Sequence, residues 1–168
     1  MRAADVAARA GVSRQAVYLH FSNRSTLLVE MARRFDRTSG FRSRLRAARL
    51  LSPLDAFRQV LTEWFAYLPS ILPVGRALES AALVGGDGAD AYRDRMSDWR
   101  AGIRLDVERL HGAGLLHDGW TIDEATDWIW THTHPTTVHH LVDERGWTID
   151  VASARLTRML EDELVVAV

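Results

Sequence analysis

The sequence predicts an all-α protein in which a helix-turn-helix domain precedes a larger α-helical ligand-binding and dimerisation bundle. Apolar residues recur three and four positions apart along most of the 168 residues, and no stretch alternates as a half-buried strand does. Gly, Pro, Ser and Thr stand where helices would begin and end. We expect a first domain over residues 1–47 and a second over residues 48–168.

Charge is distributed unevenly between these two parts. Residues 1–49 hold eleven Arg against three acidic residues, a net charge of +8, whereas the rest of the chain holds ten Arg against nineteen acidic residues, a net charge of −9. Such an asymmetry indicates that the first part meets a polyanion. The alternative is a solvated basic face without a partner, and charge alone does not choose between the two.

The first part carries the pattern of two short helices around a tight turn. Residues 2–10 and 13–21 have helical spacing of apolar residues, and Ala7 allows a close approach of the two helices. Gly11 is placed to end the first helix, and Ser13 is a good N-cap for the second. A helix, a Gly-containing turn of about three residues and a second helix together predict a helix-turn-helix.

Three runs in this part resemble a known family pattern. They are Val6-Ala-Ala-Arg-Ala-Gly-Val-Ser13, Ala16-Val-Tyr-Leu-His-Phe21 and Asn23-Arg-Ser-Thr-Leu-Leu28. Together they are similar to the DNA-binding pattern of the TetR family of bacterial transcriptional regulators, which is roughly I-A-x-x-A-G-V-S-x-x-x-[LI]-Y-x-[YH]-F-x-x-K-x-x-L-[LI]. The resemblance fixes residue types at many spaced positions, so it is specific.

The resemblance implies that residues 13–21 form the recognition helix in the major groove of operator DNA. Side chains near its N-terminus would meet base edges, with Arg14 suited to guanine, Gln15 to adenine and Ala16 to a thymine methyl group. Phosphate contacts would position the helix without specifying sequence, and an alternative role for Tyr18 and His20 is capping of the three-helix core. The expected DNA-binding residues are Ser13, Arg14, Gln15, Ala16, Tyr18, His20 and Arg24.

The sequence departs from the family pattern at its start. The family has another helix before this motif, whereas Met1 stands almost inside the second helix here. We therefore expect an incomplete DNA-binding domain that lacks its first helix and does not reach full affinity for DNA.

The second part predicts a series of longer helices. Ser52 and Asp55 form a good helix start, and Pro69 and Pro73 are expected to end that helix. The pentapeptide Gly-Trp-Thr-Ile-Asp occurs at 119–123 and at 146–150, each time with Thr placed as an N-cap. The expected helices cover residues 26–37, 42–51, 53–68, 74–84, 90–111, 122–144 with an interruption near Pro135, and 149–166.

Large aromatic residues of the second part are candidates for a small-molecule site. Trp64, Trp99 and Trp128 fall on three different expected helices, and the resemblance places the family's ligand pocket inside this bundle. The alternative is that these side chains simply fill the core. The expected ligand-binding residues are Phe57, Trp64, Met96, Trp99, Ile103, Trp128 and His132.

Four His in nine residues, from His132 to His140, form an unusual cluster. Pro135 interrupts helical ligand spacing, and neither Cys nor a carboxylate lies inside the cluster, so we expect no bound metal. A pH-sensitive dimer seam or a polar pocket wall is the favoured interpretation, because His titrates near neutrality.

These observations predict a cytoplasmic, ligand-responsive repressor that binds a palindromic operator in double-stranded DNA as a homodimer. A small, largely apolar effector would release it, and no cofactor, membrane contact or enzymatic activity is expected. No apolar run is long enough for a membrane span, and the absence of Cys excludes disulfides. The alternatives are a dimeric small-molecule sensor that no longer binds DNA and a His-metal hydrolase.

Overall fold

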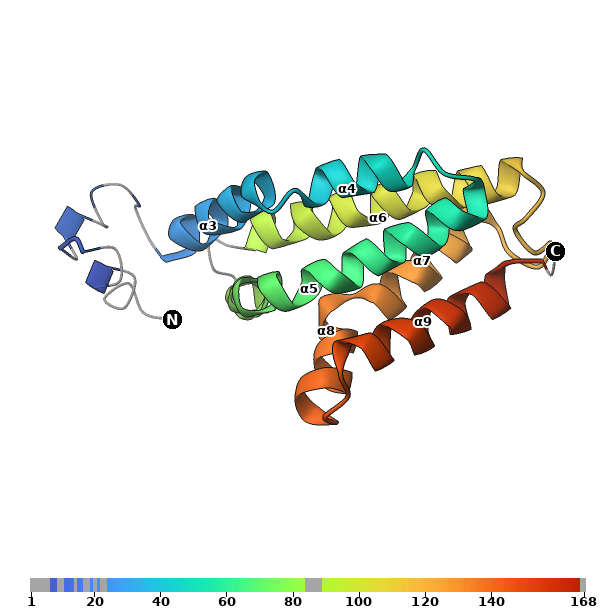
Figure 1. Ribbon diagram of the computed structural model, residues 1–168. Coiled ribbons are helices and arrows are strands. Elements are labelled where there is room, and N and C mark those ends of the chain that lie inside the picture. The colour runs from blue at the N-terminus through green and yellow to red at the C-terminus, as the bar shows by residue number, and fades with distance from the viewer. Residues whose placement is uncertain are drawn as a thin grey trace.

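The computed structural model describes residues 7–8, 11–13, 15–16, 19, 21, 24–83 and 89–166. Within them the chain is helical, and the only β-type pairing is an isolated bridge between Leu116 and Val165 (Figure 1). The expected all-α fold is confirmed. The elements are α3 (Arg24–Thr38), α4 (Phe41–Ala48), α5 (Pro53–Leu83), α6 (Ala89–Gly112), α7 (Ile122–Thr133), α8 (Pro135–His139), the π-helical turn η1 (His140–Glu144) and α9 (Ile149–Leu164).

Helix α5 differs from the expectation. Pro69 and Pro73 lie inside a single helix of 31 residues, so the prediction of two shorter helices was wrong. A proline in a helix removes one backbone hydrogen bond and usually bends or ends the helix. Both prolines are exposed here, while the neighbouring Leu68 and Leu72 are buried, and this burial keeps the helix continuous.

The two identical pentapeptides start helices, as predicted. The hydroxyl of Thr121 accepts a hydrogen bond from the Glu124 N–H, and the Glu124 carboxylate accepts one from the Thr121 N–H, which completes a capping box for α7. Thr148 caps α9 by accepting from the Val151 N–H. The predicted interruption near Pro135 is also confirmed, because α8 begins at that residue.

Helix α5 is the centre of the bundle. It packs against α6, α4, α3 and α9, while α7 packs against α6 and α9 (Figure 1). The buried apolar side chains of these helices form one continuous core, which orders the bundle around α5. Its largest fully buried members are Phe57, Leu61, Phe65, Leu68, Val107, Leu110, Ile129, Val138, Leu160 and Leu164.

The described residues before α3 keep the predicted turn. Gly11 has a φ of 66°, its N–H donates to the Ala8 carbonyl, and the Val12 N–H donates to the Ala7 carbonyl. These two bonds are those of a Schellman motif, which ends a helix at a left-handed glycine. Ser13 then caps the next turn by accepting from the Ala16 N–H at 3.0 Å.

None of the helices in the described part of the chain is long and apolar enough to cross a membrane.

Candidate effector site and DNA-binding segment

A large cleft lies between α4 and α6, with α5 beneath it. Its volume is about 760 Å³, and both charged and aromatic side chains line it. The arginines come mainly from α3 and α4, whereas Asp94 and Asp98 come from α6. We call this space the polar cleft; its lining residues are Val29, Arg33, Asp36, Phe41, Arg42, Leu45, Arg46, Arg49, Trp64, Tyr67, Ile71, Asp94, Arg95, Met96, Ser97, Asp98, Trp99 and Gly102.

Two pairs of stacked rings form the inner wall of the polar cleft. Trp64 and Trp99 stack with ring centroids 3.9 Å apart, and Phe41 and Tyr67 stack at 4.1 Å. Both indole N–H groups are satisfied by Thr133, because Trp64 donates to its carbonyl at 2.8 Å and Trp99 to its hydroxyl at 3.0 Å. All four rings are buried, so they form a rigid wall rather than loose side chains.

A second, smaller cavity adjoins the polar cleft, since Ile71, Arg95 and Met96 line both spaces. Its volume is about 230 Å³, and it follows the part of α5 that contains the two prolines. We call it the apolar cavity because most of its wall is hydrocarbon. Its lining residues are Met31, Phe35, Ser70, Ile71, Leu72, Val74, Gly75, Leu78, Tyr92, Arg95, Met96 and Pro135.

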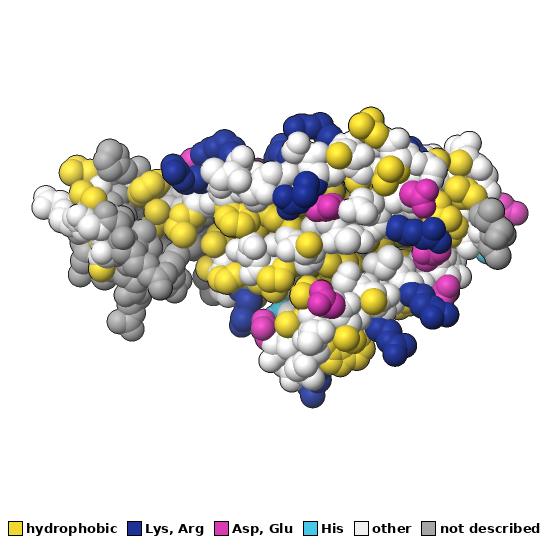
Figure 2. Space-filling model, in the orientation of Figure 1, with side chains coloured by type: hydrophobic (Ala, Val, Ile, Leu, Met, Phe, Trp, Pro, Cys, Tyr) yellow, Lys and Arg dark blue, Asp and Glu magenta, His cyan; other side chains and the backbone are white. Residues whose placement is uncertain are grey.

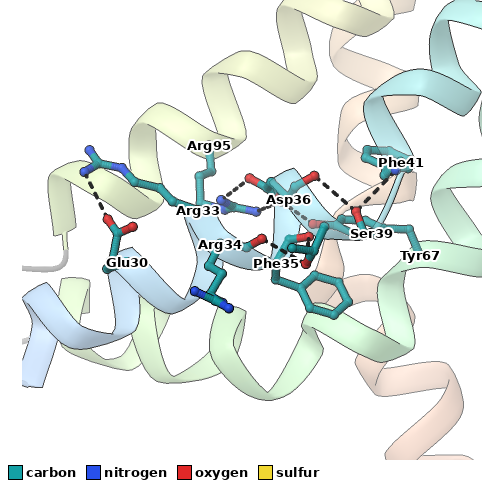
Figure 3. A network of polar contacts seen from close by, with 10 residues as sticks. Glu30, Arg33, Arg34, Phe35, Asp36, Ser39, Phe41, Tyr67 and Arg95 are labelled. Atoms are coloured by element: carbon teal, nitrogen blue, oxygen red, sulfur yellow. Dashed lines mark hydrogen bonds and ion pairs between the residues drawn. The ribbon is translucent and has the colours of Figure 1, made fainter.

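An ion pair joins α3 to α6 between the two spaces (Figure 3). Arg95 donates two hydrogen bonds to the Asp36 carboxylate, at 2.6 and 2.9 Å, and the Tyr67 hydroxyl donates to the same carboxylate. Burial disfavours the charged form of Asp36, but the bonds from Arg95 and Tyr67 outweigh it and hold the pKa of Asp36 below its usual range. Asp36 is therefore an ionised anchor for α3, and we call this group the α3 link.

A second ion pair joins α4 to α6 at another point of the polar cleft. Arg49 donates to the two oxygens of Asp106 at 2.9 and 2.8 Å, and also to the Gly102 carbonyl at 2.9 Å. A Cβ on Gly102 would lie 3.3 Å from the Arg49 guanidinium, so the glycine allows this close approach. We call this group the α4 link.

The structure brings some predicted ligand-binding residues together and leaves others apart. Trp64, Met96 and Trp99 line the polar cleft, and Met96 also lines the apolar cavity. Phe57 and Ile103 are buried in the core and line neither space.

Trp128 and His132 lie elsewhere on the structure, outside both spaces. Trp128 is 39% exposed, and the His132 ring packs on it with centroids 4.2 Å apart. The predicted proximity of this pair is confirmed, but the pair faces away from both cavities, because it occupies the outer side of α7.

The His cluster is divided by Pro135 into two environments. His134 is half-buried, with its ring nitrogen 3.3 Å from the Tyr92 hydroxyl beside the apolar cavity. Burial lowers the pKa of His134, and the negative charge of Glu79 opposes this only in part. His140 instead pairs with Glu144 at 3.0 Å. Among the described residues no group of three or more His and acidic side chains is placed to hold a metal ion.

Four of the expected DNA-binding residues, Ser13, Gln15, Ala16 and Arg24, lie within the described residues. Ser13, Gln15 and Ala16 form the start of a helical turn, and Gln15 is exposed. Helix α3 begins at Arg24. Exposed arginines gather on α3 and α4, as the blue side chains over these helices show (Figure 2). Arg14, Tyr18 and His20 lie outside the described residues.

Sequence reasoning missed the α3 link, although the sequence holds two signals for it. Asp36 is one of only three acidic residues among the first 49, so it is an exception in a basic segment. Arg95 lies three residues after Tyr92 and four before Trp99, and therefore shares the apolar side of its helix. A charge on such a side needs a partner when it is buried.

Comparison with known proteins adds two findings. Residues 1–31 match the family model of bacterial regulatory proteins, tetR family. No curated protein matches the chain significantly.

Several solved structures share the fold. A protein described as a transcriptional regulator from Saccharomonospora viridis, in complex with choline, is 18% identical with a TM-score of 0.82, and the match covers 99% of this chain and 88% of that one. A protein described as a TetR-family transcriptional regulator from Rhodococcus sp. is 19% identical with a TM-score of 0.71, covering 96% and 86%. One described as a fatty acid metabolism regulator from Clostridium perfringens is 12% identical with a TM-score of 0.73, covering 99% and 90%.

At these identities the structural likeness concerns the fold, while the family model concerns the first 31 residues. Residues 1–31 are thus similar to bacterial regulatory proteins of the tetR family, and the described part of the chain has the α-helical fold of these solved structures. The match over residues 1–31 supports a regulator of the TetR type. Regulators of this type bind DNA and small-molecule ligands.

Proposed function

We propose that this chain is a repressor that binds a palindromic operator as a homodimer and is released by a small, largely apolar effector. The observation that carries the proposal is the position of the α3 link. Asp36 stands on the helix that leads out of the DNA-binding segment, and its partner Arg95 lines both cavities of the bundle. A ligand that binds there acts directly on the attachment of α3.

The coupling follows from differential binding. An effector shifts the regulator between two states only to the extent that it binds one of them more tightly. In the state described here α3 is held by Arg95 and Tyr67, so a ligand that competes for these groups favours a state with α3 displaced. A displaced α3 changes the spacing of the two recognition helices, which an operator with half-sites about 34–36 Å apart requires.

We place the proposed dimer seam on α7 and α9. The buried side of α9 packs on α5, yet Val151 and Met159 on the same helix are exposed, as is Trp128 on α7. Exposed apolar side chains on two neighbouring helices are typical of a subunit interface. Sedimentation velocity should show a dimer, and Met159→Glu should shift it toward monomer.

The remaining assignments of the proposal rest on the sequence and on the family resemblance. The domain boundary between residues 47 and 48 stays a prediction, as do the roles of Ser13, Gln15 and Ala16 at base edges. A regulator of chromosomal genes works in the cytoplasm, where its operator is.

The test is a fluorescence anisotropy titration on duplexes from the upstream region of the gene, over a salt series. A repressor should bind one duplex selectively, with an affinity that falls steeply as salt rises, because phosphate contacts release counterions. Gln15→Ala should reduce the selectivity by about 1–3 kcal/mol. Thr62→Ala, at an exposed position of α5 outside the proposed dimer seam, is the control and should leave binding unchanged. Equal binding to all duplexes would contradict the proposal.

The second candidate is a dimeric sensor that has lost DNA binding. It is supported by the two cavities, which would serve a sensor equally well. Ligand binding without any DNA binding in the same titration would favour it.

A further inference from the structure

We propose that the apolar cavity binds a small amphiphilic carboxylate whose carboxylate group replaces that of Asp36 on Arg95. The inference rests on the proposed function, because it names the ligand class of the same regulator. It concerns the end of the cavity at which α3, α5 and α6 meet.

The chemistry of the cavity wall excludes most polar ligands. Hydrocarbon and ring carbon from residues such as Phe35, Val74 and Leu78 form the greater part of it. Arg95 is the only charged residue among those that line the cavity. A ligand therefore needs an apolar body for the wall and one negatively charged group for the guanidinium.

The geometry of the guanidinium selects a carboxylate among anions. Arg95 already presents two parallel N–H donors to two carboxylate oxygens, at 2.6 and 2.9 Å. A planar fork of this kind matches a carboxylate in two bonds at once. A ligand carboxylate in the apolar cavity lies next to the Arg95 guanidinium, since Arg95 lines both spaces, and competes with Asp36 for its donors.

The size of the cavity limits the apolar body. At about 30 Å³ for each water-sized group, a volume of 230 Å³ holds roughly eight such groups. Hexanoate and octanoate are of this size. A chain of twelve carbons would exceed the cavity unless the protein rearranges.

The released carboxylate of Asp36 keeps other partners. The Tyr67 hydroxyl still donates to it, and the positive charge of Arg42 on α4 lies near enough to favour its ionised form. Ligand binding thus exchanges one carboxylate for another on Arg95 without leaving a buried charge alone. The change that remains is the loss of the bond between α3 and α6.

The competing arrangement is a cation in the polar cleft, against Asp94 and Asp98 and the aromatic wall. Cations bind over ring faces, and a choline complex exists among proteins of similar fold. In this chain, however, Trp64 and Trp99 stack on each other, as do Phe41 and Tyr67, so each ring already has one face covered. The observations favour the carboxylate.

Calorimetric titration of the full chain, without DNA, tests the proposal. The probes are octanoate below its micellar concentration, octanol and octyltrimethylammonium. Octanoate should bind, and octanol, which lacks the charge, should bind on the order of tenfold more weakly or worse. Equal binding of octanol, or tighter binding of octyltrimethylammonium, would overturn the proposal.

Three variants locate the site. Arg95→Gln should abolish the preference for octanoate over octanol, while Arg100→Gln on the exposed surface of the same helix should keep it. Val74→Phe should fill the cavity, leave the α3 link intact and weaken both octanoate and octanol. If Arg95→Gln lowers thermal stability too far for titration, Val74→Phe still decides, because unchanged octanoate binding by that variant places the ligand elsewhere and overturns the proposal.

The inference and the proposed function fail separately. Selective operator binding without octanoate binding would overturn the inference and leave the repressor intact. Octanoate binding with the expected Arg95 dependence but no DNA binding would support the inference and remove the repressor function.

Discussion

The α3 link and the α4 link are chemically the same connection in two surroundings. Each is a bidentate Arg–Asp pair, and each ties an N-terminal helix to α6. The Asp106 side chain of the α4 link is 3% exposed, whereas the Asp36 side chain of the α3 link is 18% exposed. Only the arginine of the α3 link lines a second space, the apolar cavity.

The surroundings of an Arg–Asp pair decide whether the pair is a fixed or an exchangeable connection. Where the carboxylate is buried against a helix, as Asp106 is, no outside group reaches it and the pair is a fixed part of the structure. Where the carboxylate is less buried and the arginine also borders the apolar cavity, as in the α3 link, a ligand can compete for the arginine, and the same kind of pair becomes exchangeable. Substitutions at the two links should therefore differ in size and in kind.

The largest effect is expected for Arg49→Met, which removes the partner of the buried Asp106. A buried charge left alone should destabilise the fold by about 3–5 kcal/mol. Urea denaturation followed by circular dichroism measures the loss. Arg46→Met, an exposed position on the same helix, is the control and should change stability little. A loss for Arg49→Met no larger than that of the control would show that the α4 link is not a fixed connection.

A smaller effect is expected for Asp36→Asn in the α3 link. The amide keeps the shape but not the charge, so Arg95 loses its ionised partner and the fold loses about 1–3 kcal/mol. Asp94→Asn, an exposed carboxylate at the polar cleft, is the control. The same urea titration should rank Arg49→Met, Asp36→Asn and Asp94→Asn in that order. A larger loss of stability for Asp36→Asn than for Arg49→Met would contradict the view that the α4 link is the more fixed of the two.

The pH dependence of stability should single out the α3 link. The pKa of Asp36 is lowered in the folded state from its ordinary value of 3.8. The stabilisation is therefore complete above about pH 4 and is lost as pH falls through the folded pKa. Urea titrations between pH 3 and pH 7 measure the free energy of unfolding of the natural chain and of Asp36→Asn. The difference between the two should narrow only at the acid end of this range. A gap that stays constant to pH 3 would contradict an ionised Asp36.

The sequence predicted most helices of this fold because their local signals agree with their packing. Thr121 and Thr148 cap α7 and α9, and Gly11 ends the first described turn, as expected from residue type alone. Pro69 and Pro73 misled the prediction because burial of one side of α5 outweighs the loss of two backbone bonds, and burial depends on helices distant in sequence.

The candidate site was predicted only in part, for a similar reason. Aromatic residues such as Trp64 and Trp99 indicate a core or a pocket, and both of them line the polar cleft. Which side of a helix faces a cavity depends on the helices packed against it. Residue spacing alone could therefore not distinguish the exposed Trp128 from the cleft-lining Trp64 and Trp99. The pairing of Asp36 with Arg95 spans 59 residues, so local patterns mark each residue as unusual but do not identify the two as partners.

The smallest expected effect on stability is that of Tyr67→Phe, and it tests most directly whether the α3 link is exchangeable. Tyr67→Phe removes one hydroxyl from the α3 link and leaves the ion pair and the ring stack on Phe41 in place. Burial and the charge of Asp36 raise the pKa of Tyr67, so this hydroxyl stays protonated and donates; its loss should cost about 0.5–1.5 kcal/mol in urea titration. If the link is exchangeable, Asp36 depends on this bond most when a ligand holds Arg95. Tyr67→Phe should therefore weaken octanoate binding as well, whereas in a fixed link it would lower stability alone.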